Sequence, residues 1–385
     1  MSGSSPFPLL LLLLVSISSS EDLDLVRRNS DFAARLFRSV ASRSDDNVFL
    51  SPLTLSAALT ALASATTGST HEQLLKGLGL SGLDVSTVTD FFQNLQNSKP
   101  AHLLSGLGLF PDQHVQLQSS YVDLVQNKLG ATVQKVVYSE PQEAADLINR
   151  WAQYQTGDQV KDIVTDLDSQ TPLLLASVAS YQGRFQPAFN ASLTQEERFY
   201  VDRYHVVMTS MMFRADKFFL AYDRALKTGL LKLPMTEGAA MLVVFPDADV
   251  DVTVVEEQVT SEKIQTWIQQ LKKTKLEVQL PRFLLERSYT LKNILMDLEV
   301  TQVFQEDADL TNMSGTKGTR LTQVFHKSLL SVDESSDDIT AGGGATAFSS
   351  PPPRLTINRP FIFIIYQQIS GNILGMGRVL DPSRK

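Results

Sequence analysis

The chain has 385 residues, 43% of them hydrophobic and 20% charged, so it can bury a large core. Its net charge of −8 at pH 7 argues against nucleic acid as a main partner, because phosphate binding needs clustered positive charge. There is no cysteine, which excludes disulfides, thiolate nucleophiles and cysteine-ligated zinc.

The first 20 residues have the pattern of a secretory signal peptide. An apolar run over 9–15 is followed by small polar residues over 16–20, and the run is too short to span a bilayer. The pattern departs from the usual one in that no lysine or arginine precedes the run. The sequence therefore predicts a secreted, extracellular protein with no membrane span. Glycosylation sequons at Asn190 and Asn312 agree with secretion.

The remaining elements follow from apolar spacing and from helix start signals. Helices are predicted at 32–40, 52–65, from residue 71 onward, 119–127 and 141–156. Strands are predicted at 47–50, 239–245, 275–280, 361–366 and 373–380. At the second helix, Ser51 is expected to cap the first turn and Pro52 to open it, while Ser69 or Thr70 is expected to cap the helix that begins at His71.

One segment, 333–353, has an unusual composition. It begins with acidic residues, continues with small residues over 341–345 and ends in three prolines, and Ile339 is its only large apolar residue before Phe348. About twenty residues without their own secondary structure inside a compact domain indicate a functional loop or disorder. Because apolar strands lie on both sides, the sequence predicts an exposed loop held at both ends, which is a favourable protease target.

Motifs for an enzyme are missing. The chain has no Gly-x-Ser-x-Gly nucleophile elbow, and its five histidines are scattered without metal-ligand spacing. We therefore expect neither catalysis nor a metal. Lys272, Lys273 and Lys275 form a small basic cluster, which we interpret as the solvated start of a strand, with glycosaminoglycan contact as the alternative.

Taken together, several motifs resemble those of the serpin family, in the family's order and over nearly all of 30–382. They lie at 47–52, 68–73, 148–151, 156–157, 211–213, 231–234, 331–334, 358–361 and 377–382. Within the family, the chain is most similar to the plasma clade that contains antitrypsin and the protein Z-dependent protease inhibitor. The resemblance implies one α+β domain over 21–385, with three β-sheets, about nine helices and a reactive-centre loop at about 334–358.

The resemblance also implies a function. A serpin of the inhibitory kind is a monomeric suicide substrate: an extracellular serine protease cleaves the loop, forms an acyl-enzyme, and is distorted when the loop inserts into the main sheet. Serpin loop insertion is itself a standard example of this strand addition. No catalytic residue and no small-molecule cofactor are implied.

The loop departs from the inhibitory pattern at its hinge, which comprises Glu334, Ser335, Ser336, Asp337, Asp338, Ile339 and Thr340. Inhibitory members have small, uncharged residues here, because side chains alternate into the protein as the strand inserts. One of the two adjacent aspartates must then face inward, and burying an unpaired carboxylate is costly. The acidic hinge favours a second hypothesis, a serpin without inhibitory activity that acts as a binding, carrier or signalling protein.

The cleaved bond is predicted in two places. Phe348–Ser349 places an aromatic residue before a serine and suits a protease with a chymotrypsin-like hydrophobic pocket. Counting the family's usual loop length from Glu334 gives Ser350–Pro351 instead, where the proline hinders most serine proteases. Phe348–Ser349 is the preferred bond.

Overall fold

A computed structural model describes residues 20–335 and 351–385, and every structural statement below refers to these two ranges. They contain ten α-helices and fourteen strands. The helices are α1 (Ser20–Ala41), α2 (Pro52–Ala65), α3 (Gly68–Gly77), α4 (Val85–Asn97), α5 (Ser119–Leu129), α6 (Pro141–Gln155), α7 (Val252–Glu256), α8 (Ser261–Gln270), α9 (Lys292–Asp297) and α10 (Thr311–Ser314). The strands are β1 (Val48–Leu50), β2 (Leu103–Pro111), β3 (Thr132–Val133), β4 (Leu173–Gly183), β5 (Gln195–Tyr200), β6 (Val206–Asp223), β7 (Thr228–Pro234), β8 (Ala239–Pro246), β9 (Lys272–Pro281), β10 (Phe283–Thr290), β11 (Gln323–Val332), β12 (Arg354–Thr356), β13 (Phe361–Gln367) and β14 (Ile373–Val379).

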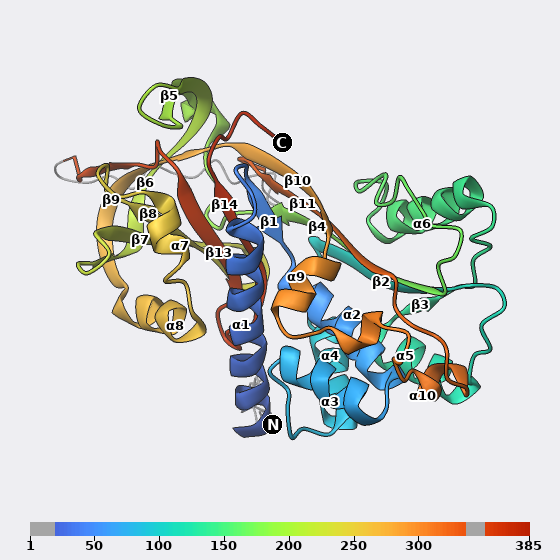
Figure 1. Cartoon of the computed structure of the whole chain (residues 1–385). Helices are drawn as coiled ribbons and strands as arrows, with labels where there is room; N and C mark the ends of the chain where they lie inside the picture. Colours follow the sequence, from blue (N-terminus) through green and yellow to red (C-terminus); the bar gives the residue numbers. More distant parts are fainter. Residues whose placement is uncertain (1–19, 336–350) are drawn as a thin grey trace, which may run out of the picture.

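The strands form two hydrogen-bonded sheets (Figure 1). A five-stranded sheet has the order β10-β11-β4-β2-β3, and a nine-stranded sheet has the order β1-β14-β13-β8-β7-β6-β9-β12, with β5 also paired to β6. Three sheets were expected. Two of them are continuous here, because the 18-residue strand β6 pairs with β5 near its start, with β9 along its middle and with β7 at its end.

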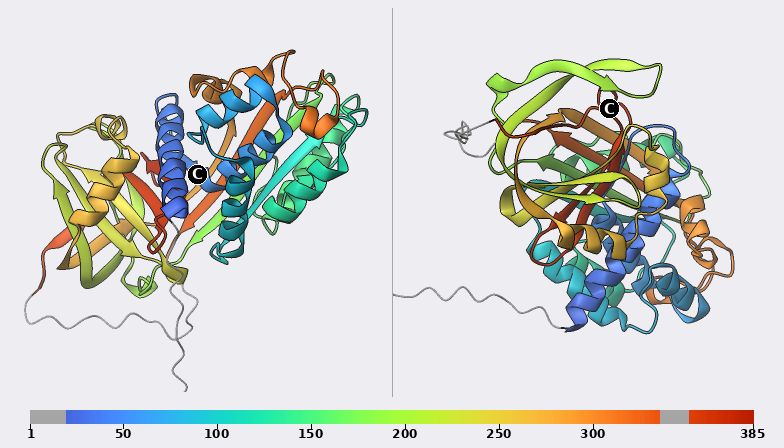
Figure 2. Two further views of the ribbon diagram at one scale, coloured as in Figure 1. Left: turned by 90° about the horizontal axis from the view of Figure 1, so that it is seen from below. Right: turned by 90° about the vertical axis from the view of Figure 1, so that its left-hand side faces the viewer.

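Helices cover both faces of the five-stranded sheet where β4 crosses it. Leu173 and Leu175 of β4 belong to the main hydrophobic core, which also contains most of α2. Leu174 and Val178 belong to a second cluster with Trp151 of α6. Because neighbouring side chains of a strand point to opposite faces, β4 is buried on both sides. Figure 2 shows α1 running alongside the sheets.

Most predicted elements are confirmed, with two corrections at helix starts. Pro52 opens α2, but the Ser51 hydroxyl does not cap it; it contacts Thr54 Oγ1 at 2.9 Å and donates to a carbonyl of β14. Helix α3 begins at Gly68 and not at His71. Thr70, expected as its cap, instead accepts a hydrogen bond from the distant Asp309 amide at 3.0 Å. The side chains of Ser51 and Thr70 thus make tertiary contacts instead of capping helices. No described helix is long and apolar enough to cross a membrane.

Candidate functional site

The candidate loop connects β11 to β12 and to the residues that follow β12. Its described parts are Glu334, Ser335 and 351–358. The remaining hinge residues (Ser336, Asp337, Asp338, Ile339, Thr340) and three of the reactive-bond residues (Phe348, Ser349, Ser350) lie outside the described residues. Pro351 is described and is exposed. The structure therefore bears on how the two ends of the loop are held.

The first end of the loop is held by Glu334. Its carboxylate accepts two hydrogen bonds from the Arg282 guanidinium, at 2.8 and 2.9 Å, and a third from the Thr194 hydroxyl. Burial acts to raise the pKa of Glu334, but these donors outweigh it and the pKa is lowered. Asp333 closes the adjacent turn, because its carboxylate accepts from the Ser335 amide at 2.8 Å. The carboxylate of Glu334, the first residue of the hinge, is thus already paired where the loop begins.

The second end is held by pairing with a strand. β12 runs parallel to β9, and the Glu277 amide donates to the Pro353 carbonyl at 2.9 Å. Arg354 forms an ion pair with Glu277 at 2.9 Å, and the Thr356 hydroxyl donates to Gln279 Oε1 at 2.7 Å. These contacts fix the chain from Pro353 onward to the nine-stranded sheet.

The strand before the loop, β11, has a parallel neighbour in its sheet. β11 pairs with β4 in parallel, in continuous register over the ten residues of β11, and the loop begins directly after Val332. His326 bridges this pair: its Nδ1 contacts Ser177 Oγ at 3.1 Å, and its Nε2 accepts from the Ser51 amide at 3.2 Å. Burial lowers the pKa of His326 to about 4, so the imidazole is neutral at physiological pH. A strand that enters between β11 and β4 must break this bridge.

The basic cluster is larger in the structure than in the sequence. Lys272, Lys273 and Lys275 are exposed on β9, and Lys275 lies directly opposite Lys217 of β6. Strand alternation places Lys232 of β7 on the same face as Lys217 and Lys275. Sequence reasoning missed Lys217 and Lys232, because they are separated from the cluster by 40 residues or more in the sequence.

The two sequons lie at the surface. Asn312 is exposed on α10, and its Nδ2 donates to the Thr66 carbonyl at 3.2 Å. Asn190 is partly buried; its side chain accepts from the Ser192 amide at 3.0 Å and caps a short 3-10 turn.

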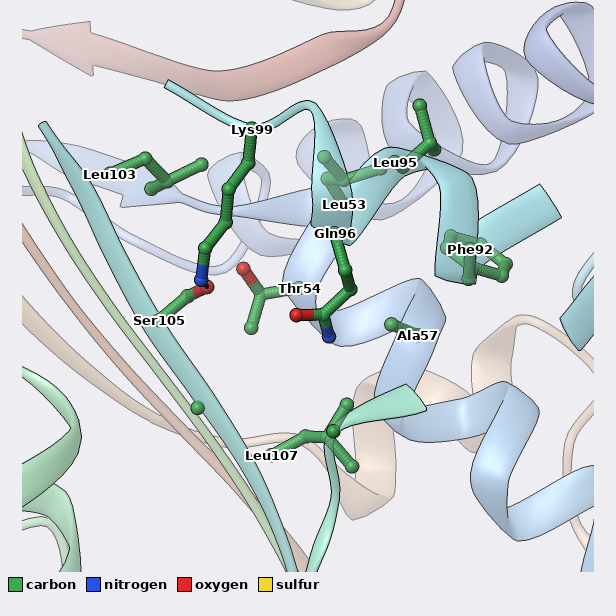
Figure 3. Close-up of a pocket in the computed structure, with 12 residues that line it drawn as sticks. Leu53, Thr54, Ala57, Phe92, Leu95, Gln96, Lys99, Leu103, Ser105 and Leu107 are labelled. Atoms are coloured by element: carbon green, nitrogen blue, oxygen red, sulfur yellow. Dashed lines mark hydrogen bonds between the residues drawn. The ribbon is translucent and has the colours of Figure 1, made fainter. Parts of the chain in front are cut away.

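Two partly enclosed cavities within the described residues differ in size. The cavity in Figure 3, between α2, α4 and β2, has a volume of about 40 Å³. Lys99 reaches across it to donate to Ser105 Oγ at 3.1 Å, and burial lowers the pKa of Lys99. This space is close to that of one water molecule. A second cavity, between α1, α8 and the turn from β13 to β14, has a volume of about 220 Å³. Across the described ranges, no group of three or more acidic or histidine side chains could hold a metal ion.

A parallel strand pair leading into a long segment that is anchored at both ends defines the class of strand-inserting inhibitors and their relatives. Residues 27–382 match the family profile described as Serpin (serine protease inhibitor), and the chain belongs to the serpin family. The expected α+β serpin fold is therefore confirmed.

The chain is similar to several known serpins. It is 28% identical to mouse (Mus musculus) protein Z-dependent protease inhibitor, over 93% of this chain and 82% of that protein, and the crystal structure of the mouse protein superposes with a TM-score of 0.88 at 27% identity, covering 95% and 100% of the two chains. It is 29% identical to alpha-1-antitrypsin of Sus scrofa, over 92% and 86%. The structure of human thyroxine-binding globulin complexed with thyroxine superposes with a TM-score of 0.86 at 23% identity, over 95% and 100%, which shows a shared fold.

Proposed function

We propose that this protein is a secreted, glycosylated, monomeric inhibitor of an extracellular serine protease, and that it acts as a suicide substrate through loop cleavage and insertion. The observation that carries the proposal is the parallel pairing of β11 with β4 directly before the loop. The names of the similar mouse and pig proteins support the same activity.

The pairing gives insertion a thermodynamic reason. A segment that follows β11 and turns back along it runs antiparallel to both β11 and β4, because those two strands are parallel to each other. Its insertion replaces one parallel ladder by two antiparallel ladders, and antiparallel pairing is the slightly more stable kind per residue. The inserted side chains also enter a sheet that is covered on both faces, so apolar surface is removed from water.

The hinge limits how fast this can happen. Glu334 is already paired with Arg282, whereas Asp337 and Asp338 must enter the sheet with one carboxylate facing inward. The neighbouring strand β4 is almost entirely buried, so the aspartate that faces inward must be paired, or protonated with a raised pKa. The small, uncharged residues over 341–345 present no such barrier to insertion.

For the scissile bond we propose Phe348–Ser349, with Ser350–Pro351 as the alternative, and a protease of chymotrypsin-like preference. Thermal unfolding before and after nicking by chymotrypsin tests this proposal, together with denaturing gels and mass spectrometry of the released peptide. A covalent complex, a large rise in melting temperature and a new N-terminus at Ser349 support it. Nicking without either of the first two results contradicts inhibition.

A second candidate function, that of a small-molecule carrier, is favoured by the 220 Å³ cavity. Two buried polar atoms at this cavity, Tyr366 Oη and Ser261 Oγ, have no hydrogen-bond partner. Apolar walls come from Val26, Ile264 and Ile268. Because buried hydroxyls are normally paired, this arrangement suits an apolar ligand that carries one or two hydrogen-bonding groups.

The carrier hypothesis is tested by thermal unfolding in the presence of thyroxine and of a panel of small apolar phenols and carboxylates. The free energy of unfolding of a carrier rises with the logarithm of ligand concentration above the Kd, and Tyr366→Phe should weaken that effect. Absence of stabilisation by every compound, with a covalent protease complex, leaves inhibition as the function.

A further inference from the structure

Four of the exposed large apolar side chains in the described residues gather in one hairpin, formed by β5 and the first residues of β6. Tyr200, Val206 and Met208 are 42%, 47% and 56% exposed, and Tyr204 in the connecting turn is 89% exposed. Tyr200 is directly opposite Val206, and Arg198 is directly opposite Met208. Because opposed residues share a face, these four side chains form one continuous outer face of the hairpin.

The hairpin is held in place from its inner face and at its turn. Phe199 is fully buried and Thr209 is 7% exposed, so the inner face packs on the body of the protein. Asp202 closes the turn: its carboxylate accepts from the amides of Tyr204 and His205, at 2.7 and 2.9 Å. A preorganised apolar surface loses little conformational entropy when it binds a partner.

Both ends of the candidate loop are bonded to this hairpin. The Tyr200 amide donates to the Asn358 carbonyl at 2.8 Å, at the far end of the loop. Thr194, directly before β5, donates to Glu334 at the near end, and the Arg282 amide donates to the Ser210 carbonyl of β6 at 2.8 Å. The hairpin therefore lies beside the two described ends of the loop, at one end of the molecule (Figure 2).

We propose that the outer face of the β5–β6 hairpin, made by Arg198, Tyr200, Val206 and Met208 with Tyr204 at its tip, is a secondary docking site for the protease that engages the loop. This inference rests on the proposed function. Tyrosine, methionine and arginine are enriched at protein interfaces, and contiguous exposed apolar side chains mark interaction sites. The occupant is a folded protease that presents an apolar patch next to its active-site cleft, bordered by a carboxylate that meets Arg198.

The test compares a hairpin variant with a matched control. The hairpin variant carries Tyr200→Thr, Val206→Thr and Met208→Thr, which keep strand propensity. The control variant carries Tyr154→Gln, Val254→Gln and Ile369→Thr, which remove similarly exposed apolar side chains elsewhere. The measured quantity is the second-order rate of loop cleavage in the intact protein by chymotrypsin, trypsin and pancreatic elastase. A synthetic peptide of residues 334–358, which lacks the hairpin, gives the reference rate.

For the protease that cuts wild type fastest, we expect the hairpin variant to be cut at least about tenfold more slowly than wild type. The control variant should be cut at the wild-type rate. The peptide, which carries none of these substitutions, keeps its reference rate. The single substitution Tyr204→Ser, in a side chain that is almost fully exposed, should give a smaller loss in the same direction and does not threaten folding. Because the readout is cleavage, it remains valid if no covalent complex forms, so failure of inhibition and failure of docking are distinguishable.

Two results overturn the proposal. One is a cleavage rate of the hairpin variant within twofold of wild type for all three proteases. The other is a wild-type dimer in analytical ultracentrifugation that the hairpin substitutions dissociate while cleavage rates stay the same, which would assign the face to a second copy of this chain.

Discussion

Arg282 and Glu334 form a bidentate ion pair across 52 residues of sequence, and it holds the chain at the point where β11 ends and the loop begins. The pair joins the β9–β10 connection to the hinge, so it resists movement of the first residue that an inserting strand would displace. The Glu334 side chain is 7% exposed, whereas that of Arg282 is 48% exposed.

Replacing Arg282 by Ala should therefore destabilise the hinge more than the fold as a whole. We expect a loss of about 1 kcal/mol in the free energy of unfolding, since the arginine is half exposed, and faster spontaneous loop insertion or self-association on mild heating. Glu334 has a lowered pKa, so its contribution is present above its ordinary value of 4.5 and is lost as pH falls below it. Urea unfolding at pH 7 and pH 4 measures the loss in the free energy of unfolding and its dependence on pH. Lys317→Ala, which removes the more exposed Lys317–Asp309 pair, is the control, and an equal loss in it would refute the assignment.

The acidic hinge gives the sharpest prediction about inhibition. Asp337→Thr with Asp338→Ala should raise the fraction of protease encounters that end in covalent complex, because no carboxylate then has to be buried during insertion. The partition between complex and cleaved protein on denaturing gels is the measurement. Glu306→Thr with Asp307→Ala removes another exposed adjacent acidic pair and should change nothing. If the hinge variant partitions like wild type, the acidic hinge is not the barrier.

His326 predicts a specific pH dependence of stability. Its folded pKa of about 4 lies below the ordinary value of 6.5, so the folded state disfavours the charged form. Stability is then complete above pH 6.5 and falls as pH drops from 6.5 to 4, by about 3 kcal/mol in total. His326→Gln should remove this slope in urea unfolding between pH 7.5 and 4.5, whereas His114→Gln, in a histidine that is 82% exposed, should keep it.

The buried pair between Glu256 and Arg378 should be essential to the fold. Arg378 Nη1 donates to both Glu256 oxygens, at 2.9 and 3.0 Å, and burial raises the pKa of Glu256 despite the charge of Arg378. Glu256→Ala leaves a buried guanidinium without its anion and should lower stability by about 3–5 kcal/mol. Thermal unfolding of Glu256→Ala against the exposed neighbour Glu257→Ala checks this, and comparable melting temperatures for the two variants would contradict it.

The basic face of β6, β7 and β9 predicts polyanion binding. We propose that Lys272, Lys273 and Lys275 contact a glycosaminoglycan together with Lys217, since Lys217 and Lys275 are exposed and directly opposed, which concentrates positive charge on these strands. Lys217→Gln with Lys275→Gln should weaken heparin binding in titration calorimetry and make the dependence of its affinity on salt shallower by about two ions. Lys128→Gln with Lys76→Gln, in lysines of other surfaces, is the control; equal weakening would indicate a non-specific charge effect.

The sequence by itself determined the family and most of the order of elements. Apolar runs such as 239–245 and 361–366 predicted the buried strands β8 and β13, because a strand covered on both faces cannot alternate with polar residues. The motif at 331–334 spans the end of β11 at Val332, directly before the loop that the sequence predicts.

Only the tertiary structure decided which distant side chains meet. Nothing near Glu334 in the sequence pointed to Arg282 or Thr194, and nothing in the short polar run at 195–206 indicated that Tyr200 and Val206 share an outer face beside the loop. Several strand neighbours in these sheets come from segments far apart in the sequence, as with β4 and β11, where Leu174 lies opposite Gln323. Local propensity carries no information about such pairings, since they are selected by burial of the whole core, and the parallel pair that insertion would split is one of them.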